Sequence, residues 1–300
     1  MKPEKLIGIM PALLTGFTDD GSALDLNRTQ KLLDFVIKKG VNGVYVGGSS
    51  GEMLLLSNDE RKALLEAVME VAKGKISVIV HVGGAGTREA VDLARHAAKA
   101  GADAVSAVTP LYFGYTFANV KSYYSAIANA SELPCIVYNI PSLSGMKLTL
   151  AQMEELLNLP NVAGMKFTAT DFFQLERLRT KFPDKVLYNG FDEMLIAGLS
   201  VGADGGIGTT YNYQPERILG IYRLFKEGKA EEARKLQVKA NELIEAVCKY
   251  SVMPASKEVL AIGGMPYGTC RAPFLPLDDD AKADLRKAVI ENLGENFMVL

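Results

Sequence analysis

A lysine ends a short apolar segment near the middle of the chain, Val162–Lys166, which has the composition of a buried strand. Burial disfavours the charged form of an amine and favours the neutral form, which can attack a ketone and form an imine. Lys166 is therefore a candidate nucleophile. The structural alternative is a lysine that reaches solvent or pairs with a carboxylate, because buried lysines are rare and usually paired. This segment alone leaves both interpretations open.

A tyrosine ends a second apolar segment, Cys135–Tyr138. A phenol at a strand end can relay a proton while an imine forms or a carbon–carbon bond breaks. Taken alone, such a residue is more often an aromatic cap whose hydroxyl has a hydrogen-bond partner. Tyr138 is thus a candidate acid/base group only if other residues place it beside a reactive centre.

A glycine-rich segment with two serines, Gly47–Gly51, follows a predicted strand. Its free backbone N–H groups and the hydroxyls of Ser49 and Ser50 could bind a carboxylate or a phosphate. The segment also matches the G-x-S-x-G nucleophile elbow of serine hydrolases, with Ser49 as nucleophile. That chemistry needs a histidine base, which comes late in the hydrolase chain, whereas the two histidines here are His81 and His96. The hydrolase remains a distant alternative.

The elements that must position these residues alternate between short apolar segments and amphipathic ones. The predicted strands are Gly8–Leu14, Gly43–Val46, Ile76–Val82, Ala104–Val108, Cys135–Tyr138, Val162–Lys166, Val186–Tyr188 and Gly205–Ile207. The predicted helices between them are Leu24–Lys39, Asp59–Ala72, Thr87–Ala100, Phe117–Ala130, Leu150–Leu157, Phe172–Lys181, Glu193–Leu199 and Pro215–Lys226. This pattern predicts an α/β fold, a (β/α)8 TIM barrel, although an open doubly wound sheet would show the same alternation.

Beyond Gly228 the strand pattern ends, and Ala230–Val247, Ala255–Ala261 and Asp280–Leu293 have helical patterns. We therefore expect a catalytic barrel over residues 1–228 and a C-terminal helical extension, packed on it, over residues 229–300. Active groups of such barrels gather at the C-terminal strand ends. Asp192 and Glu193 follow the seventh strand, where an acidic first helical turn is the structural alternative.

Composition excludes several classes of function. The net charge is −2 and the pI about 5.9, so no basic field attracts nucleic acid. The apolar segments are too short to cross a bilayer, and the N-terminus lacks the apolar core of a signal peptide. The three cysteines have no spacing that suggests disulfides or zinc. We expect a cytoplasmic protein that uses no metal.

In order along nearly the whole chain, these segments resemble the pyruvate-dependent lysine aldolases that include dihydrodipicolinate synthase and N-acetylneuraminate lyase. The shared motifs are Gly47–Glu52, Thr109-Pro110, Tyr138–Pro141 and the strand that ends in Lys166. The segments that look specifically like sialic acid lyases are Val44–Gly48, Ala104–Pro110, Tyr138–Gly145, Tyr188–Glu193 and Gly202–Gly208. The resemblance favours the functional interpretation of both Lys166 and Tyr138.

Carried over by position, the resemblance implies that Lys166 forms the imine, Tyr138 assists proton transfer, and Ser49 and Ser50 hold the carboxylate. It places on the sugar side Thr168, Gly190, Asp192, Glu193, Gly208 and Thr209. The implied reaction is the reversible cleavage of N-acetylneuraminate to N-acetyl-D-mannosamine and pyruvate, with no cofactor. The family is usually homotetrameric, with Tyr112 or a neighbour reaching the adjacent subunit's site.

One position argues for an uncharged aldehyde partner. Dihydrodipicolinate synthases carry an arginine where this chain has Leu143, and an apolar side chain cannot pair with a carboxylate. Alternatives within the family are dihydrodipicolinate synthase itself and an aldolase for 2-keto-3-deoxygluconate. A non-catalytic sugar-acid sensor is disfavoured, because a sensor needs no isolated lysine at a strand end. Thr209, where many lyases have serine, and Gly16, where proline is common, depart from the lyase pattern.

Overall fold

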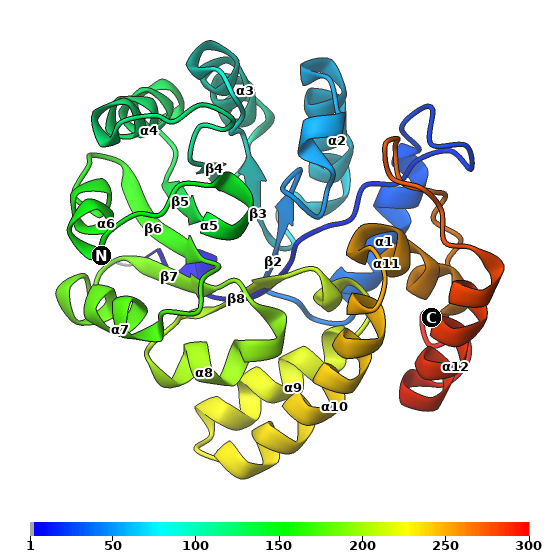
Figure 1. Ribbon diagram of the computed structural model, residues 1–300. Helices are drawn as coiled ribbons and strands as arrows, with labels where there is room; N and C mark the ends of the chain where they lie inside the picture. Colours follow the sequence, from blue (N-terminus) through cyan, green and yellow to red (C-terminus); the bar gives the residue numbers. More distant parts are fainter. Residues whose placement is uncertain (1–2, 300) are drawn as a thin grey trace.

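The computed structural model describes residues 3–299, and its centre is a ring of eight parallel strands (Figure 1). The strands are β1 (Gly8–Pro11), β2 (Gly43–Val46), β3 (Ser77–His81), β4 (Ala104–Val108), β5 (Cys135–Asn139), β6 (Val162–Phe167), β7 (Val186–Asn189) and β8 (Gly205–Gly208). β1 pairs with β8 in parallel. The ring closes between β1 and β2 through a bridge from Ala12 to Tyr45. The predicted TIM barrel is confirmed and the open doubly wound sheet is wrong.

Helices alternate with the strands around the barrel. They are α1 (Leu26–Lys38), α2 (Asn58–Ala72), α3 (Thr87–Ala100), α4 (Phe117–Ser131), α5 (Pro141–Ser144), α6 (Leu150–Leu157), α7 (Phe172–Lys181), α8 (Leu195–Ser200) and α9 (Pro215–Lys226). Capping boxes at Ser57, Thr116 and Thr149 start α2, α4 and α6, because each side chain accepts from a backbone N–H of the first turn. The four-residue α5 is too short for a periodic pattern and was not predicted.

The strands are buried on both faces, as their continuous apolar sequences predict. One core lies inside the barrel and includes Met10, Ile79, Ile136 and Ile207. A larger core fills the space between the barrel strands and the surrounding helices. The interior is therefore packed, and reactive groups can be reached only at the strand ends.

The C-terminal helices α10 (Ala230–Cys248), α11 (Val252–Ile262) and α12 (Asp279–Leu293) gather on one side of the barrel (Figure 1). α10 packs along α9, and α11 and α12 pack on each other. The Tyr267 hydroxyl, just beyond α11, donates to the Leu14 carbonyl at 2.7 Å and ties this segment to the loop after β1. Within residues 3–299, no helix is long and apolar enough to span a membrane.

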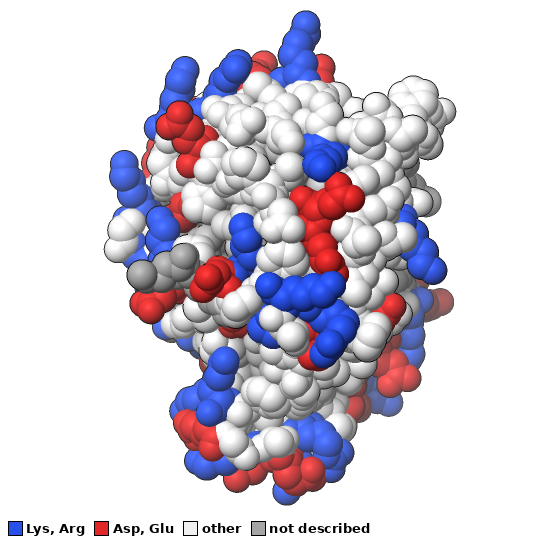
Figure 2. Space-filling model, turned by 90° about the vertical axis from the view of Figure 1, so that its left-hand side faces the viewer, with Lys and Arg blue, Asp and Glu red and all other residues white. Residues whose placement is uncertain are grey.

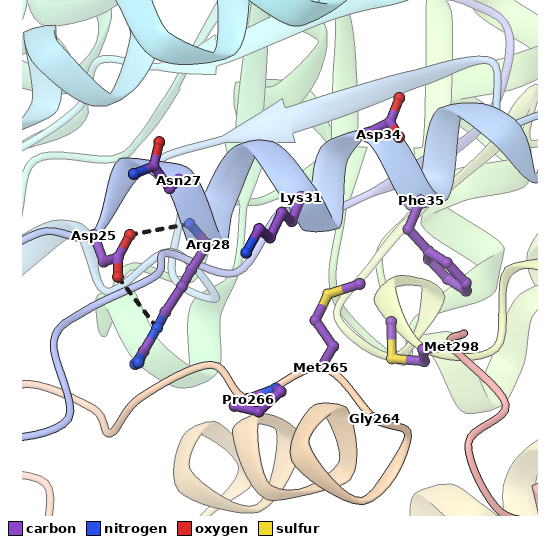
Figure 3. Close-up of a pocket in the computed structure, with 10 residues that line it drawn as sticks. All are labelled: Asp25, Asn27, Arg28, Lys31, Asp34, Phe35, Gly264, Met265, Pro266 and Met298. Carbon is purple, nitrogen blue, oxygen red and sulfur yellow. Dashed lines mark hydrogen bonds and ion pairs between the residues drawn. The ribbon is translucent and has the colours of Figure 1, made fainter. Parts of the chain in front are cut away.

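A cavity of about 600 Å³ lies between α1 and the chain that follows α11 (Figure 3). Phe35 of α1 contributes one wall, while Met265 and Met298 contribute the other. Asp25 accepts from the backbone N–H of Arg28 at 3.1 Å and forms an ion pair with its guanidinium at 3.2 Å. These charged groups cap the start of α1. The cavity is therefore a gap between α1 and the C-terminal segment that packs on it.

Candidate active site

The register of two neighbouring strands places Tyr138 of β5 directly beside Lys166 of β6. Their exposed fractions are 3% and 5%, and the Lys166 Nζ lies 4.1 Å from the centre of the Tyr138 ring. Within residues 3–299, no carboxylate forms an ion pair with this amine. The structural alternative of a lysine neutralised by a carboxylate is therefore not found, and the amine is available for chemistry.

Tyr45 of β2 supplies a second ring against the same amine, with its centre 4.7 Å from the Lys166 Nζ. The Tyr45 hydroxyl donates to Ser106 at 3.0 Å, and Ser106 donates to the Ile136 carbonyl at 2.8 Å. Burial raises the pKa of this phenol well above its ordinary value, so it stays protonated. Tyr45 was not among the candidate site residues that the sequence pattern indicated. Its signal was an aromatic residue in an apolar strand immediately before the glycine-rich loop.

His81 is buried beside these rings but does not activate Ser49. The backbone N–H of Val108 donates to His81 Nε2 at 3.0 Å, and Arg61 donates to the His81 carbonyl at 2.9 Å. Burial, with the nearby charges of Arg61 and Lys166, lowers the pKa of this imidazole well below its ordinary value. Its Nε2 is committed to the backbone and its Nδ1 lies 3.4 Å from the Arg61 Nη2, so neither nitrogen is left to act as a base for a hydrolase nucleophile.

The second histidine, His96, is remote from the strand ends. It lies 2.8 Å from Glu66, on the outer surfaces of α3 and α2. The contact joins α2 and α3 on the outside of the barrel and gives His96 a structural role.

The Gly47–Glu52 loop brings its serines to the mouth of the barrel. Ser50 hydrogen-bonds with Thr209 at 2.6 Å between the two hydroxyl oxygens. Ser49 is half-buried and lines a cavity of about 560 Å³ with Leu111 and Ile140. The loop must approach closely here, since a Cβ on Gly48 would lie 2.5 Å from the Tyr45 ring. A group expected on the carboxylate side, Ser50, thus touches one expected on the sugar side, Thr209.

Two glycines leave room for polar groups at the ends of β6, β7 and β8. A Cβ on Gly190 would lie 1.9 Å from the Thr168 hydroxyl oxygen, and one on Gly208 would lie 2.1 Å from an Asp192 carboxylate oxygen. The Thr168 hydroxyl is buried without a hydrogen-bond partner. Buried polar groups are usually paired, so an unpaired one at the mouth of a barrel is positioned to bind a ligand.

Asp192 is 7% exposed and points across to the loop after β8. Its Oδ2 accepts from the backbone N–H and from the hydroxyl of Thr210, both at 2.7 Å. Burial nevertheless raises the pKa of this carboxyl to about 6, against the opposing effect of those hydrogen bonds. The residue begins a 3-10 turn, Asp192–Met194, whose N-cap Phe191 makes no side-chain cap. Asp192 therefore does not act only as an acidic residue at a helix start, because it also binds the loop after β8. Its partner Thr210 was not predicted from the sequence.

Glu193 is half-buried, and its backbone carbonyl accepts from Asn241 of α10 at 3.2 Å. The structure does not bring Tyr112 or Leu143 onto Lys166. Tyr112 is 92% exposed with its ring against Phe113, and Leu143 of α5 is 68% exposed. Among residues 3–299, no cluster of histidine, cysteine, aspartate or glutamate is arranged to hold a metal ion.

A lysine flanked by aromatic rings at the C-terminal end of a barrel strand is an arrangement suited to imine chemistry on a keto acid. The chain belongs to the dihydrodipicolinate synthetase family, whose model matches residues 5–292.

Within that family, the chain is similar to several proteins named as N-acetylneuraminate lyases. The chain is 45% identical over 285 residues to an N-acetylneuraminate lyase of Rhizobium meliloti, covering 95% of each protein. It is also similar to a Clostridium difficile protein solved in complex with mannosamine, with a TM-score of 0.93 and 36% identity over 96% of this chain and 99% of that one. An N-acetylneuraminate lyase of Fusobacterium nucleatum complexed with pyruvate gives a TM-score of 0.91 and 36% identity over 97% and 99%.

Proposed function

We propose that this chain cleaves N-acetylneuraminate reversibly to N-acetyl-D-mannosamine and pyruvate, as a class I aldolase. The observation that carries the proposal is the buried amine of Lys166, held against Tyr138 and Tyr45 with no carboxylate partner within residues 3–299. Membership of the dihydrodipicolinate synthetase family and close similarity to lyases of sialic acid support the same reaction.

The chemistry begins when the amine of Lys166 attacks the C2 ketone and water leaves, which forms an imine. The protonated imine accepts the electron pair of the C3–C4 bond as that bond breaks, and the proton of O4 leaves at the same time. The product on the enzyme is an enamine, and the aldehyde sugar departs. Protonation of C3 and hydrolysis then release pyruvate and restore the amine. We assign the proton transfers to Tyr138, whose ring centre lies 4.1 Å from the reacting nitrogen and whose phenol is the acid/base group of this neighbourhood.

The remaining residues divide between the two ends of the substrate. Ser49 and Ser50, with the glycine-rich backbone, hold the carboxylate. The sugar hydroxyls lie against Thr168, Gly190, Asp192, Glu193, Gly208 and Thr209. A covalent imine is the electron sink, so the reaction as proposed uses no metal or other cofactor. Of the proposed catalytic barrel, residues 1–228, and its C-terminal extension, residues 229–300, the first two residues and the last lie outside the described residues.

We also propose a homotetramer that works in the cytoplasm. Large apolar side chains are exposed in the loops at the mouth of the barrel, Tyr112 at 92%, Phe113 at 66% and Leu54 at 65%. Figure 2 shows a neighbouring side of the molecule, where charged side chains of both signs surround broad stretches of uncharged surface. Such surfaces suit association with another copy, through which Tyr112 reaches an adjacent site. Sedimentation velocity on the purified protein measures this: a species of one chain would contradict it.

The deciding experiment is a substrate panel read by pyruvate. Release from N-acetylneuraminate is expected to be faster than release from 2-keto-3-deoxygluconate, and faster than consumption of pyruvate with aspartate semialdehyde. The opposite ranking would assign the chain to another aldolase of the family. A fluorophosphonate probe provides the control for the hydrolase alternative, since labelling of Ser49 would support that chemistry and its absence is expected.

A further inference from the structure

A buried ion pair joins the Gly47–Glu52 loop to the C-terminal helices. The Glu52 Oε1 lies 2.7 Å from the Lys257 Nζ, and the two side chains are 0% and 2% exposed. Glu52 ends the loop that carries the two serines, while Lys257 lies in α11, far along the chain. Burying both charges is costly unless the geometry is well fixed, and removing one partner leaves the other unpaired in the interior. The mutual position of loop and helix is therefore tightly constrained.

Further contacts fix both ends of the pair. The Lys257 Nζ donates to the Thr269 carbonyl at 2.9 Å and lies 4.3 Å from the centre of the Phe17 ring. The second carboxylate oxygen of Glu52 accepts from the backbone N–H of Arg271 at 2.9 Å. Neither side chain can rotate without losing a contact, because the surrounding partners come from separate parts of the chain.

The backbone at Glu52 depends on these contacts. Its φ is 58°, in the left-handed region that residues other than glycine rarely occupy, and such conformations persist only where the surroundings determine them. The same turn is closed by hydrogen bonds from the Glu52 N–H to the Ser49 carbonyl at 3.1 Å and from the Gly51 N–H to the Gly48 carbonyl at 3.0 Å. The carboxylate thus holds a strained residue two positions after Ser50, in the same hydrogen-bonded turn as the two serines.

We propose that the Glu52–Lys257 pair positions the Gly47–Glu52 loop, so that the C-terminal helices set how tightly the site binds the carboxylate of its keto acid. This inference rests on the proposed role of Ser49 and Ser50. Among the described residues, the two charges contact each other, Phe17 and the C-terminal segment, and neither contacts the reacting amine. Their loss is therefore expected to weaken keto-acid binding and to leave imine formation at saturation largely unchanged.

The test measures borohydride trapping of pyruvate as a function of pyruvate concentration in the full-length protein. The variants are Lys257→Met and Glu52→Gln, which remove one charge each, and the double variant that removes both. The pyruvate concentration that gives half-saturation is expected to rise by at least about tenfold. This is the loss of affinity typical of one misplaced hydrogen bond to a charged group. The trapping rate at saturation is expected to stay within about threefold of wild type. A threefold change corresponds to a free energy well below that of one such hydrogen bond.

The double variant keeps the test decisive if a single variant fails to fold, because it leaves no unpaired buried charge. Arg179→Met is the matched control: Arg179 forms a half-buried ion pair with Asp204 at 2.6 Å, beside the backbone of Gly202 and Lys185 and away from the serine loop. That variant is expected to lower the melting temperature without moving half-saturating pyruvate. Lys257→Arg, which retains the charge, is expected to recover part of the lost affinity.

A folded double variant that reaches half-saturation at the wild-type pyruvate concentration would overturn the proposal. A lower trapping rate at saturating pyruvate, with half-saturation unchanged, would also overturn it. Failure of the proposed function has a different signature, because the wild-type protein itself would then form no adduct with pyruvate.

Discussion

Lys166 and Asp192 are both almost completely buried, at 5% and 7% exposed, yet their surroundings differ. Aromatic rings from β2 and β5 lie against the amine of Lys166 at 4.7 and 4.1 Å. The carboxylate of Asp192 instead accepts two hydrogen bonds of 2.7 Å from Thr210. We call these surroundings the imine end and the sugar end of the site.

The difference separates reactivity from recognition. A carboxylate partner would hold the amine in its charged form, whereas the two rings carry no charge, so the nitrogen can react as a neutral amine. Fixed hydroxyls and carboxylates bind a polyol through directed hydrogen bonds. A misplaced substrate leaves these buried polar groups unpaired. Changes at the imine end are therefore expected to alter every reaction of the enzyme, whereas changes at the sugar end are expected to alter only reactions of the sugar.

Tyr138→Phe is expected to give the largest effect among substitutions that keep the packing of the imine end. The ring remains but the hydroxyl is lost, and a positioned acid/base group contributes about 10²–10⁴-fold to rate. Turnover of N-acetylneuraminate, measured by pyruvate release, should fall within that range, with the melting temperature nearly unchanged. Turnover close to wild type would make Tyr138 a packing residue.

Asp192→Ala and Glu193→Ala test the sugar end. Loss of one hydrogen bond to a charged group costs about 1.5–3 kcal/mol, or roughly 10- to 150-fold in kcat/KM for N-acetylneuraminate. Borohydride trapping of pyruvate is expected to remain nearly intact in the same variants. Equal losses in both assays, in a protein that a thermal melt shows to be folded, would contradict the assignment of separate roles to the two ends.

The raised pKa of Asp192, about 6, gives the sugar end a pH dependence of its own. As pH falls through 6 the carboxylate is protonated and becomes a weaker acceptor for sugar hydroxyls, so the KM for N-acetylneuraminate should rise. Pyruvate trapping should show no step at that pH, and Asp192→Asn should abolish the step for the sugar. A step near pH 6 that survives in Asp192→Asn would assign it to another group.

The same raised pKa predicts that the stability of the fold also depends on pH. Asp192 stabilises the fold more as pH falls, whereas sugar binding weakens. A carboxyl whose pKa is higher folded than unfolded binds its proton more tightly in the folded state. It stabilises the fold most at pH values below its unfolded pKa of 3.8, and this contribution falls as pH rises to 6, by about 3 kcal/mol in all. Urea unfolding of wild type and Asp192→Asn at several pH values measures it: wild type should lose stability relative to Asp192→Asn as pH rises from 4 to 6.

Leu143→Arg is expected to give the smallest change. The side chain is 68% exposed on α5, and exposed substitutions shift stability by no more than about 0.5 kcal/mol. A new cation beside a pocket for a neutral polyol should weaken sialic acid cleavage modestly, without producing efficient condensation of pyruvate with aspartate semialdehyde. If the wild-type protein already prefers that condensation, the interpretation of Leu143 is wrong.

Local signals predicted most of the fold. The bounds of β2, β4, α3, α6, α7 and α9 agree with the sequence, because apolar runs and helical periodicity are properties of neighbouring residues. Strand β1 ends at Pro11 rather than Leu14, since the chain beyond it meets β2 only at the single bridge that closes the barrel. That closure depends on the whole ring, so no single segment could reveal it.

The site follows the same rule. Lys166 and Tyr138 were candidates because each ends an apolar strand, and the family resemblance joined them before their shared register was known. The contact between Ser50 and Thr209 and the ion pair between Glu52 and Lys257 were not predictable, because each links segments far apart in the sequence. Lys257 did leave a signal, a lysine within the apolar helical stretch Ala255–Ala261. The roles of all the predicted site residues, on the imine side as well as the sugar side, stay predictions.

The most direct measurement is the position of the covalent adduct. Borohydride reduction with pyruvate, followed by proteolysis and mass spectrometry of the peptides, is expected to place the adduct on Lys166 alone. Lys166→Met should remain folded by thermal melt and lose both the adduct and the release of pyruvate from N-acetylneuraminate. An adduct on a different lysine, or full trapping in folded Lys166→Met, would contradict the assignment of the imine to the amine between Tyr45 and Tyr138.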